Sequence, residues 1–333
     1  MTTTNDYILL GISATLHLLV DGVCMCCLFL MATLVGSDEL MGSVIVYNVF
    51  AFLTQPLTGL LADSSKHRQK LLLTSNLLLL AGAASAVFAV LHMQLSTPLL
   101  TTIAVLLGMG NSLFHVWGGK QTAVETHNDI RALGIFVSTG ALGLALGMLF
   151  CSWSLLFVFL LAISVLSGVY IKMEQRAGSI STNDERLAEH ATNATRATLT
   201  LSLPVVCLAV LGLMVFVAFR SFLGEAFSTG ITRTNNIVLL IAFITTAGKM
   251  AGGWIARWMG IVPSLLAIAA IVAAAFLTAQ WLGMSALLAG LFAINLTMPI
   301  TLYLANRVLE GREGLAFGLL AAALIPGYLL ATI

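Results

Sequence analysis

The stretch YILLGISATLHLLVDGVCMCCLFLMATLV, residues 7–35, is long and apolar enough to cross a lipid bilayer. Similar runs recur along the 333-residue chain, which is 59% hydrophobic and only 9% charged. A soluble domain carries about 25% charged residues. The composition therefore predicts a polytopic membrane protein. Because the apolar runs lack period-two alternation, they indicate helices rather than barrel strands.

Eleven such runs follow one another along the chain. No basic residue precedes the first, so we expect a retained helix rather than a cleaved signal peptide. The predicted spans are 7–35, 40–62, 71–92, 97–118, 132–151, 153–172, 203–226, 235–256, 262–281, 284–305 and 314–333.

Basic residues orient these spans. If the N-terminus is cytoplasmic, all of the 15 lysines and arginines except Arg220, Arg233 and Lys249 fall in or beside cytoplasmic loops. This asymmetry predicts a multi-pass protein of the cytoplasmic (inner) membrane with a cytoplasmic N-terminus. The longest polar segment, 173–202, is predicted to be a cytoplasmic linker. It separates an N-terminal six-helix half, 1–172, from a C-terminal half, 203–333, in which five helices are seen.

An internal repeat supports this division. GLLADSSK, residues 59–66, ends the second run, and GWIARWMG, residues 253–260, ends the eighth. Each has a glycine, an alanine three positions later and then a charged residue. A second pair, RALGIFVSTGALG and REGLAFGLLAAAL, opens the fifth and eleventh runs. Two halves related by parallel repetition are typical of one transporter architecture.

These loop motifs resemble those of the major facilitator superfamily, written G-x-L-x-D-(R/K)-x-G-(R/K)-(R/K) in the first half. The second copy, GKMAGGWIARWMG at residues 248–260, has arginine where the family has aspartate. The resemblance implies a gating role, in which Asp63 meets a helix N-terminus or a basic group in one conformation and loses it in another. A solvated loop is the alternative. The candidate gating residues are Gly59, Asp63, Lys66, Arg68, Lys249, Gly253 and Arg257.

A narrower likeness is to the fosmidomycin-resistance-like branch of this superfamily. It rests on a histidine and aspartate in the first helix, GMGNSLFHV in the fourth, an arginine with a glycine ladder in the fifth and Arg-Ser in the seventh. The resemblance implies an all-α, major facilitator-type two-half bundle with about eleven helices present, the twelfth being absent or truncated. The matching positions are His17, Asp21, Asn111, His115, Arg131, Gly140, Gly143, Gly147 and Arg220.

Asp21 is the first candidate for a proton or substrate site, because ionisable groups inside a membrane are costly and usually functional. His17 lies one helical turn away on the same face and titrates near neutral pH. His115 and Asn111 are likewise one turn apart. For each of these residues the alternative is a hydrogen bond that only holds two helices together.

Arg220 and Glu225 lie near the outer end of the seventh run. They are about 140° apart around the helix, so a mutual pair is not assured. Arg220 can receive an anionic substrate or pair with Asp21, or its side chain can extend to the membrane interface. Lys249 lies deep in the eighth run, where it can pair with an acid or a carbonyl or support the loop motif.

We expect a secondary active transporter that moves a small-molecule substrate, most simply by proton-coupled efflux. No nucleotide-binding loop is present, so ATP is not expected to drive it. The expected partners are the substrate, protons and the lipid bilayer, without nucleic acid, cofactor, metal or enzymatic activity, and the expected state is a monomer. The alternatives are a membrane sensor or scaffold, or soft-metal handling by Cys24, Cys26 and Cys27.

Overall fold

The computed structural model describes residues 4–32, 35–65, 67–92, 96–188, 202–231 and 234–332. Within these ranges the regular structure is helical, without strands. Eleven helical segments are long and apolar enough to cross a membrane, from Asn5–Ala32 to Glu313–Ala331. Each agrees with a span predicted from the sequence to within several residues. The predicted all-helical, two-half bundle is confirmed.

The N-terminal half consists of α1 (Thr4–Ala32), α2 (Ser37–Asn48), the π-helical turn η1 (Val49–Leu53), α3 (Gln55–Ser64), α4 (Arg68–Leu91), α5 (Thr97–Glu125), α6 (Ile130–Leu149) and α7 (Trp153–Ala188). The C-terminal half consists of α8 (Leu203–Thr229), α9 (Asn235–Met259), α10 (Ile261–Leu282), α11 (Met284–Asn295), α12 (Thr297–Val308), α13 (Glu313–Ala322) and α14 (Leu324–Thr332).

Three of the spans are interrupted near their middle. The second consists of α2, η1 and α3, the tenth of α11 and α12, and the eleventh of α13 and α14. In each case a proline lies in the first turn of the last segment: Pro56, Pro299 or Pro326. Proline lacks an N–H and clashes with the carbonyl four positions earlier, so the preceding helix bends or ends there.

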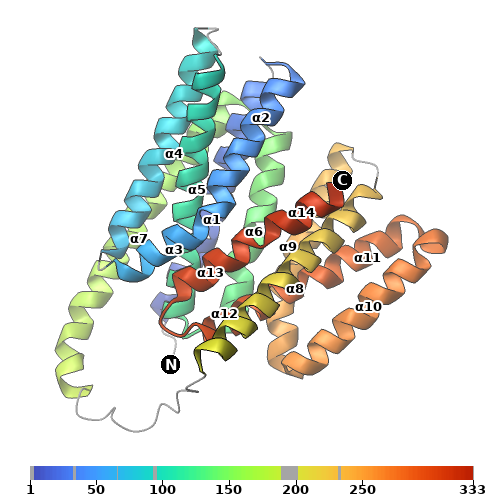
Figure 1. Cartoon of the computed structure of the whole chain (residues 1–333). Coiled ribbons are helices and arrows are strands. Elements are labelled where there is room, and N and C mark those ends of the chain that lie inside the picture. The colour runs from blue at the N-terminus through green and yellow to red at the C-terminus, as the bar shows by residue number, and fades with distance from the viewer. Residues whose placement is uncertain are drawn as a thin grey trace.

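Helix α7 is longer than its apolar run predicts. It was expected to end near residue 172, but the helix continues to Ala188. The first part of the predicted linker is therefore helical, and Figure 1 shows this end of α7 reaching below the rest of the bundle. The stretch contains no proline, and a polar helix can continue in water once it has left the apolar span. Residues 189–201 of the linker lie outside the described residues.

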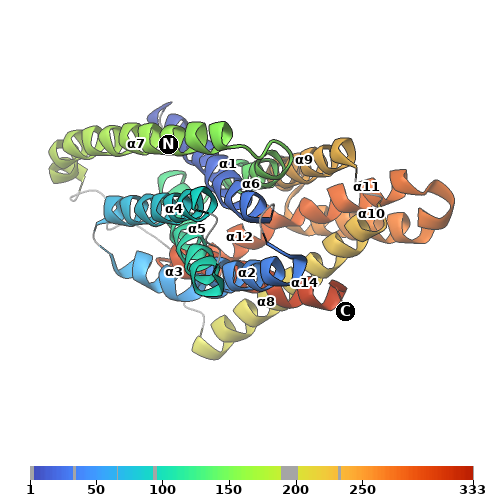
Figure 2. The same cartoon turned by 90° about the horizontal axis from the view of Figure 1, so that it is seen from above.

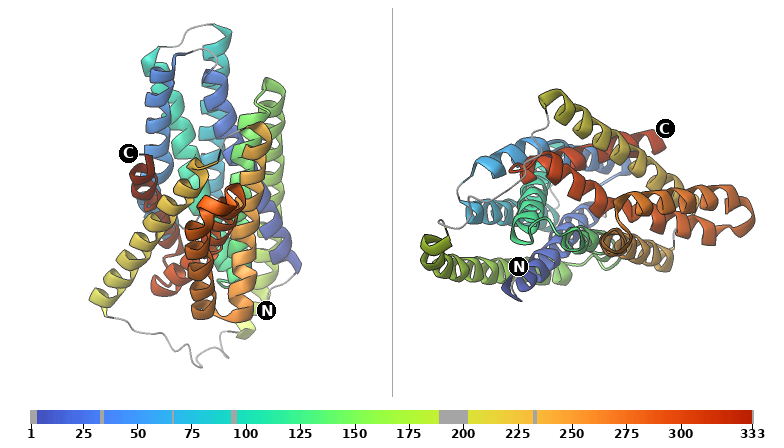
Figure 3. Two further views of the ribbon diagram at one scale, coloured as in Figure 1. Left: turned by 90° about the vertical axis from the view of Figure 1, so that its right-hand side faces the viewer. Right: turned by 90° about the horizontal axis from the view of Figure 1, so that it is seen from below.

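The two halves approach each other most closely at the lower end in Figure 1, near the N-terminus, and diverge toward the upper end. The main contacts between them are α6 along α9 and α3 along α13. Figure 2 shows α4 and α7 at one side of the molecule and α10 and α11 at the other, with α1, α5, α6 and α12 between them. From below, α13 lies beside α3 at the boundary between the halves (Figure 3).

Candidate functional site

A cavity of about 540 Å³ lies between the two halves. Small-molecule sites typically measure 300–1,000 Å³, so a compact organic solute fits. Most of its walls are apolar. In α1 its lining runs from His17 up to Phe29, toward the end of the molecule where the halves diverge. The ionisable or amide side chains that line it are His17, Asp21, Tyr47, Asn48, Gln55, Asn111, His115, Arg220 and Lys249.

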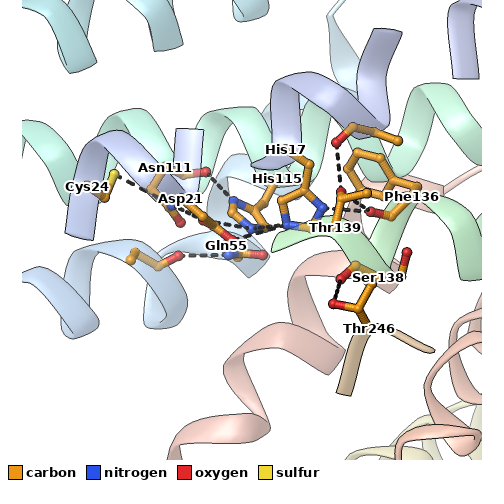
Figure 4. Close-up of polar contacts among 12 residues, drawn as sticks. His17, Asp21, Cys24, Gln55, Asn111, His115, Phe136, Ser138, Thr139 and Thr246 are labelled. Carbon is orange, nitrogen blue, oxygen red and sulfur yellow. Dashed lines mark hydrogen bonds and ion pairs between the residues drawn. The ribbon is translucent and has the colours of Figure 1, made fainter. Parts of the chain in front are cut away.

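Four of the predicted site residues meet in one buried cluster on the N-terminal wall, between α1 and α5 (Figure 4). Asn111 Nδ2 donates to Asp21 Oδ1 at 2.8 Å. His17 Nε2 lies 3.4 Å from Asp21 Oδ2, and His115 Nε2 lies 3.5 Å from Asp21 Oδ1. One carboxylate thus faces two imidazoles and an amide, although the histidines are far apart in the sequence.

The two imidazoles also contact each other through their Nε2 atoms. The hydrogen bonds of their Nδ1 atoms determine whether these facing Nε2 atoms carry a proton. His17 Nδ1 lies 2.7 Å from the Phe136 carbonyl, and His115 Nδ1 lies 2.9 Å from the Asn111 carbonyl. A carbonyl only accepts, so each Nδ1 carries the proton of a neutral ring. The two Nε2 atoms are 2.8 Å apart. That distance is a hydrogen bond only when one ring carries a second proton, and Asp21 then neutralises the imidazolium.

Helix α6 holds this cluster in place. The ring of Phe136 stacks on His17 with centroids 4.8 Å apart. The hydroxyl of Thr139 donates to the Ala14 carbonyl on α1 at 2.7 Å. At Gly140 a Cβ atom would collide with both Asp21 and His17, so the glycine leaves the space that the two side chains occupy. The first glycine of the predicted ladder is thus part of the site.

Arg220 and Lys249 line the same cavity from the C-terminal half. Arg220 is 7% exposed. Within the described residues, neither side chain has a hydrogen bond or a carboxylate at ion-pair distance, so the predicted pair of Arg220 with Asp21 is not formed. Lys249 was predicted as part of the loop motif, but its side chain faces the cavity. Glu225 is half-buried on α8 and does not line the cavity.

Two of the predicted gating residues, Gly59 and Asp63, lie at the lower end, where the halves touch. Asp63 accepts hydrogen bonds from the backbone N–H groups of Gly314 at 2.9 Å and Leu315 at 2.8 Å, and so caps the N-terminus of α13. It also pairs with Lys120 at 3.2 Å. The backbone of Gly59 lies directly against Gly314. We call these contacts of α3 with α13 the lower seal.

A related contact joins the other repeat members, α9 and α6. Gly253 lies against the backbone of Ile130 and Arg131 at the start of α6. Asp129 caps α6 itself, accepting from the Arg131 backbone at 2.9 Å, so no acid is needed at the position of Arg257. Arg257 is exposed in the last turn of α9, where a cation is favoured.

The two remaining candidate gating residues of the first loop motif are Arg68 and Lys66. Arg68 is the exposed first residue of α4. Lys66 lies outside the described residues.

The cysteines do not form a common site. Cys24, Cys26 and Cys27 are buried, and none lines the cavity. The sulfur of Cys24 points to the Leu107 carbonyl and that of Cys26 to the Ser152 carbonyl. Among the described residues, the group that could hold a metal is the buried cluster, where one donor atom each from His17, Asp21 and His115 lie within 4.8 Å of one another.

Two polar features of the structure are not among the predicted site residues. Gln55, at the start of α3, is fully buried and lines the cavity, and its Oε1 atom has no hydrogen-bond partner. An amide inside an apolar run was the available signal. The second feature is a hydrogen bond of 2.5 Å from the Tyr170 hydroxyl to Glu125, which joins α7 to the lower end of α5. Because Tyr170 and Glu125 lie far apart in the sequence, no sequence pattern indicated that they would form a hydrogen bond.

A helical bundle of two repeated halves around a central polar cluster defines a secondary transporter. The chain belongs to the Major Facilitator Superfamily, whose sequence profile it matches over residues 10–331. A comparison with curated proteins finds no match.

Solved structures show the same fold at low sequence identity. A variant of the Escherichia coli fucose:proton symporter FucP superposes with a TM-score of 0.65 at 13% identity, over 100% of this chain and 91% of that one. The human organic anion transporter MFSD10 (TETRAN) gives 0.66 at 16%, over 98% and 93%. A bacterial homologue of the iron transporter ferroportin gives 0.55 at 13%, over 97% and 90%. At these identities the likeness concerns the fold.

Proposed function

We propose that this chain is a proton-coupled secondary transporter that exports a small solute. The observation that carries the proposal is the 2.8 Å contact between His17 Nε2 and His115 Nε2, beside Asp21 and on the wall of the central cavity. Two neutral rings held in this way would direct two lone pairs at each other, whereas a single added proton makes a hydrogen bond. Export is the direction that the branch resemblance implies.

The cluster supports proton binding because its charges can balance. A proton between His17 and His115 creates an imidazolium that Asp21 neutralises at 3.4–3.5 Å. Arg220 and Lys249 line the opposite wall and oppose this added positive charge. Entry of substrate or rearrangement of the halves changes how strongly these two cations act on the cluster. Such a change couples proton occupancy to the conformation of the carrier.

The second element of the proposal is a two-state gate. In this structure the lower seal is closed, and the cavity lining runs toward the upper end. When the halves rock about the cavity, Asp63 must leave the N-terminus of α13. The backbone N–H groups of Gly314 and Leu315 then lose their acceptor, and their exposure to water compensates for part of that loss. The seal is therefore reversible.

The proposed orientation is tested by labelling. We place the N-terminus and the lower seal in the cytoplasm of a cell whose inner membrane holds the monomeric protein. A single cysteine at Ser65, in a variant stripped of its own five cysteines, should resist a membrane-impermeant thiol reagent in intact cells and react after permeabilisation. Reaction in intact cells would reverse the orientation.

The coupling proposal is tested with Asp21→Asn, which keeps size and hydrogen bonding but cannot ionise. Proteoliposomes containing an internal pH dye are screened with a panel of small solutes, and solute-driven proton flux is recorded. The wild type should show flux, and Asp21→Asn should lose it while keeping solute exchange between equally loaded compartments. Glu310→Gln, at an exposed loop carboxylate, is the matched control and should behave like the wild type.

Three outcomes would contradict the proposal. Wild-type proton flux in Asp21→Asn would make Asp21 structural. Transport of no solute by the wild type would favour a sensor or scaffold. A tightly held transition metal in purified wild type, absent from His115→Gln, would assign the cluster to a metal instead of a proton.

A further inference from the structure

Two cations on the C-terminal wall of the cavity have no counter-ion among the residues that the structure describes. Arg220 on α8 and Lys249 on α9 both line the cavity, and the described residues place no carboxylate at ion-pair distance from either. Arg220 is 7% exposed, and its Nε atom is buried without a hydrogen-bond partner. A buried charge without a partner is strongly unfavourable in the low-dielectric interior of a membrane protein. An anionic ligand that enters the cavity from outside the chain would offset this cost.

The carboxylate in the cavity cannot be the partner of either cation. Among the described residues that line the cavity, Asp21 is the only acidic one, and its oxygens already face Asn111, His17 and His115. Two fixed cations against one carboxylate leave the lining with an excess positive charge. A proton on the histidine pair increases that excess. The cavity is therefore electrostatically complementary to an anion.

The remaining walls define the other part of the ligand. Apolar side chains line the cavity on both halves, among them Phe29, Val44 and Phe52 on one side and Met298, Leu320 and Leu324 on the other. An inorganic anion would leave this surface uncovered, and a highly hydroxylated solute would lose hydrogen bonds against it. The surface suits an apolar body attached to a single charged group.

We infer that the cavity binds an amphiphilic organic anion, with its carboxylate or phosphate group held by Arg220 and Lys249 and its apolar body against the shared walls. The inference rests on the proposed transport function and names the substrate class of the same site. The planar guanidinium of Arg220 matches two oxygens of such a headgroup, and the Lys249 ammonium adds a point charge. Gln55 Oε1 and Asn111 Oδ1, both without partners, can accept hydrogen bonds from polar groups on the ligand body.

Binding to the purified protein tests this assignment directly. The protein is placed in nanodiscs of phosphatidylcholine and titrated calorimetrically with benzoate, 2-naphthoate and biphenyl-4-carboxylate at pH 7. The uncharged amide of each acid is the matched probe. Each acid should bind at least about tenfold more tightly than its amide, and affinity should rise with apolar area. If no acid binds more tightly than its amide, the inference is overturned.

Variants assign the headgroup site. Arg220→Gln and Lys249→Gln should each reduce the affinity for the acids toward that for the amides, and Arg220→Lys should recover part of it. Arg307→Gln, which removes an exposed cation outside the cavity, should bind the acids like the wild type. Unchanged acid affinity in both cavity variants would also overturn the inference. Size-exclusion profiles identify any variant that fails to fold.

Two sources of such an anion can be separated in the same assay. If the occupant is an anionic lipid, replacing part of the phosphatidylcholine with phosphatidylglycerol will weaken acid binding by competition. If it is a water-soluble acid, the affinity will stay the same, and both results retain the anion site. Because no pH gradient is present, failure of proton coupling leaves this result intact. Tighter binding of the amides than of the acids would refute the anion-binding site without bearing on the proposal of proton coupling.

Discussion

His17 and His115 are 98 positions apart in the sequence, yet their Nε2 atoms lie 2.8 Å from each other. Both Nδ1 atoms are occupied by backbone carbonyls, so neither ring can turn its protonated nitrogen toward the other without breaking a buried hydrogen bond. The pair is therefore restricted to one kind of event, the gain or loss of a proton between the rings. This restriction gives the coupling proposal a specific chemical group.

Removing either ring should abolish proton coupling. In His115→Gln no second imidazole faces His17, and the amide that replaces it does not take up a proton, so solute-driven proton flux in proteoliposomes should fall at least about tenfold. Solute exchange should continue, because the cavity keeps its other walls. His92→Gln, at an exposed histidine, is the matched control. Unchanged flux in both His17→Gln and His115→Gln would show that the contact only holds α1 against α5.

Weakening the cap on α13 should open the lower seal. Asp63→Ala removes a charged acceptor from two backbone N–H groups, an interaction worth about 1.5–3 kcal/mol per hydrogen bond to a charged group. The distance between spin labels at Ser64 and Glu310, measured by pulsed electron resonance, should shift to longer values. Asp63→Asn keeps one acceptor and should have an intermediate effect. A distance distribution identical to that of the wild type would remove Asp63 from the gate.

The close backbone approach at Gly59 should tolerate no side chain. A Cβ there would overlap the Gly314 backbone, which cannot move aside as a flexible side chain can. Gly59→Val should therefore hold the halves apart at the lower end and stop transport while the protein still inserts. Gly212→Ala, on α8 where a Cβ meets nothing, should keep transport and leave thermal stability unchanged or raised. Equal transport by the two variants would refute a backbone-contact seal.

The cap of α6 should give a pH-dependent contribution to stability. Burial alone would raise the pKa of Asp129, but hydrogen bonds from the Arg131 side chain and backbone outweigh it and hold that pKa below its ordinary value. Asp129 thus stabilises the fold above the unfolded-state pKa of about 3.9, and this is lost as pH falls through the lower folded-state value. Asp129→Ala should reduce the free energy of unfolding at pH 7 by about 1 kcal/mol, the usual worth of an N-cap, and should lower the apparent Tm accordingly.

The pH series is the check on that prediction. The difference in Tm between wild type and Asp129→Ala should be full above about pH 5 and should narrow below about pH 4. A difference independent of pH would mean that the aspartate acts through packing rather than charge.

The spans and the repeat were predictable because the bilayer imposes them. Each crossing needs about 20 apolar residues, so the run lengths located the eleven membrane-spanning segments found among the described residues. The motif around Gly59 and its copy around Gly253 likewise predicted two structurally equivalent positions in the two halves. Both glycines lie against the first turn of a helix in the other half, α13 for Gly59 and α6 for Gly253.

The pairing of particular side chains was not predictable in the same way. Helical spacing placed His17 beside Asp21, but it cannot tell which face of α1 packs against α5. The contacts of His115 with His17 and Asp21 were therefore not predictable. The same limit applied to Lys249, whose motif suggested a structural role while its side chain faces the cavity. The π-helical turn at 49–53 contains no proline or glycine, and its backbone lies against Gly108 of a different helix.

Asp63 forms an ion pair with Lys120 at 3.2 Å, and both residues belong to the N-terminal half. In the proposed gating cycle they therefore move together when α13 separates from α3, and the charge of the aspartate stays compensated in either arrangement of the halves. No ion has to be taken up from solution to open the lower seal, and almost no net charge crosses the electric field of the membrane when it does. If proton coupling operates as proposed, its stoichiometry and its response to membrane voltage should then be set at the central cluster alone.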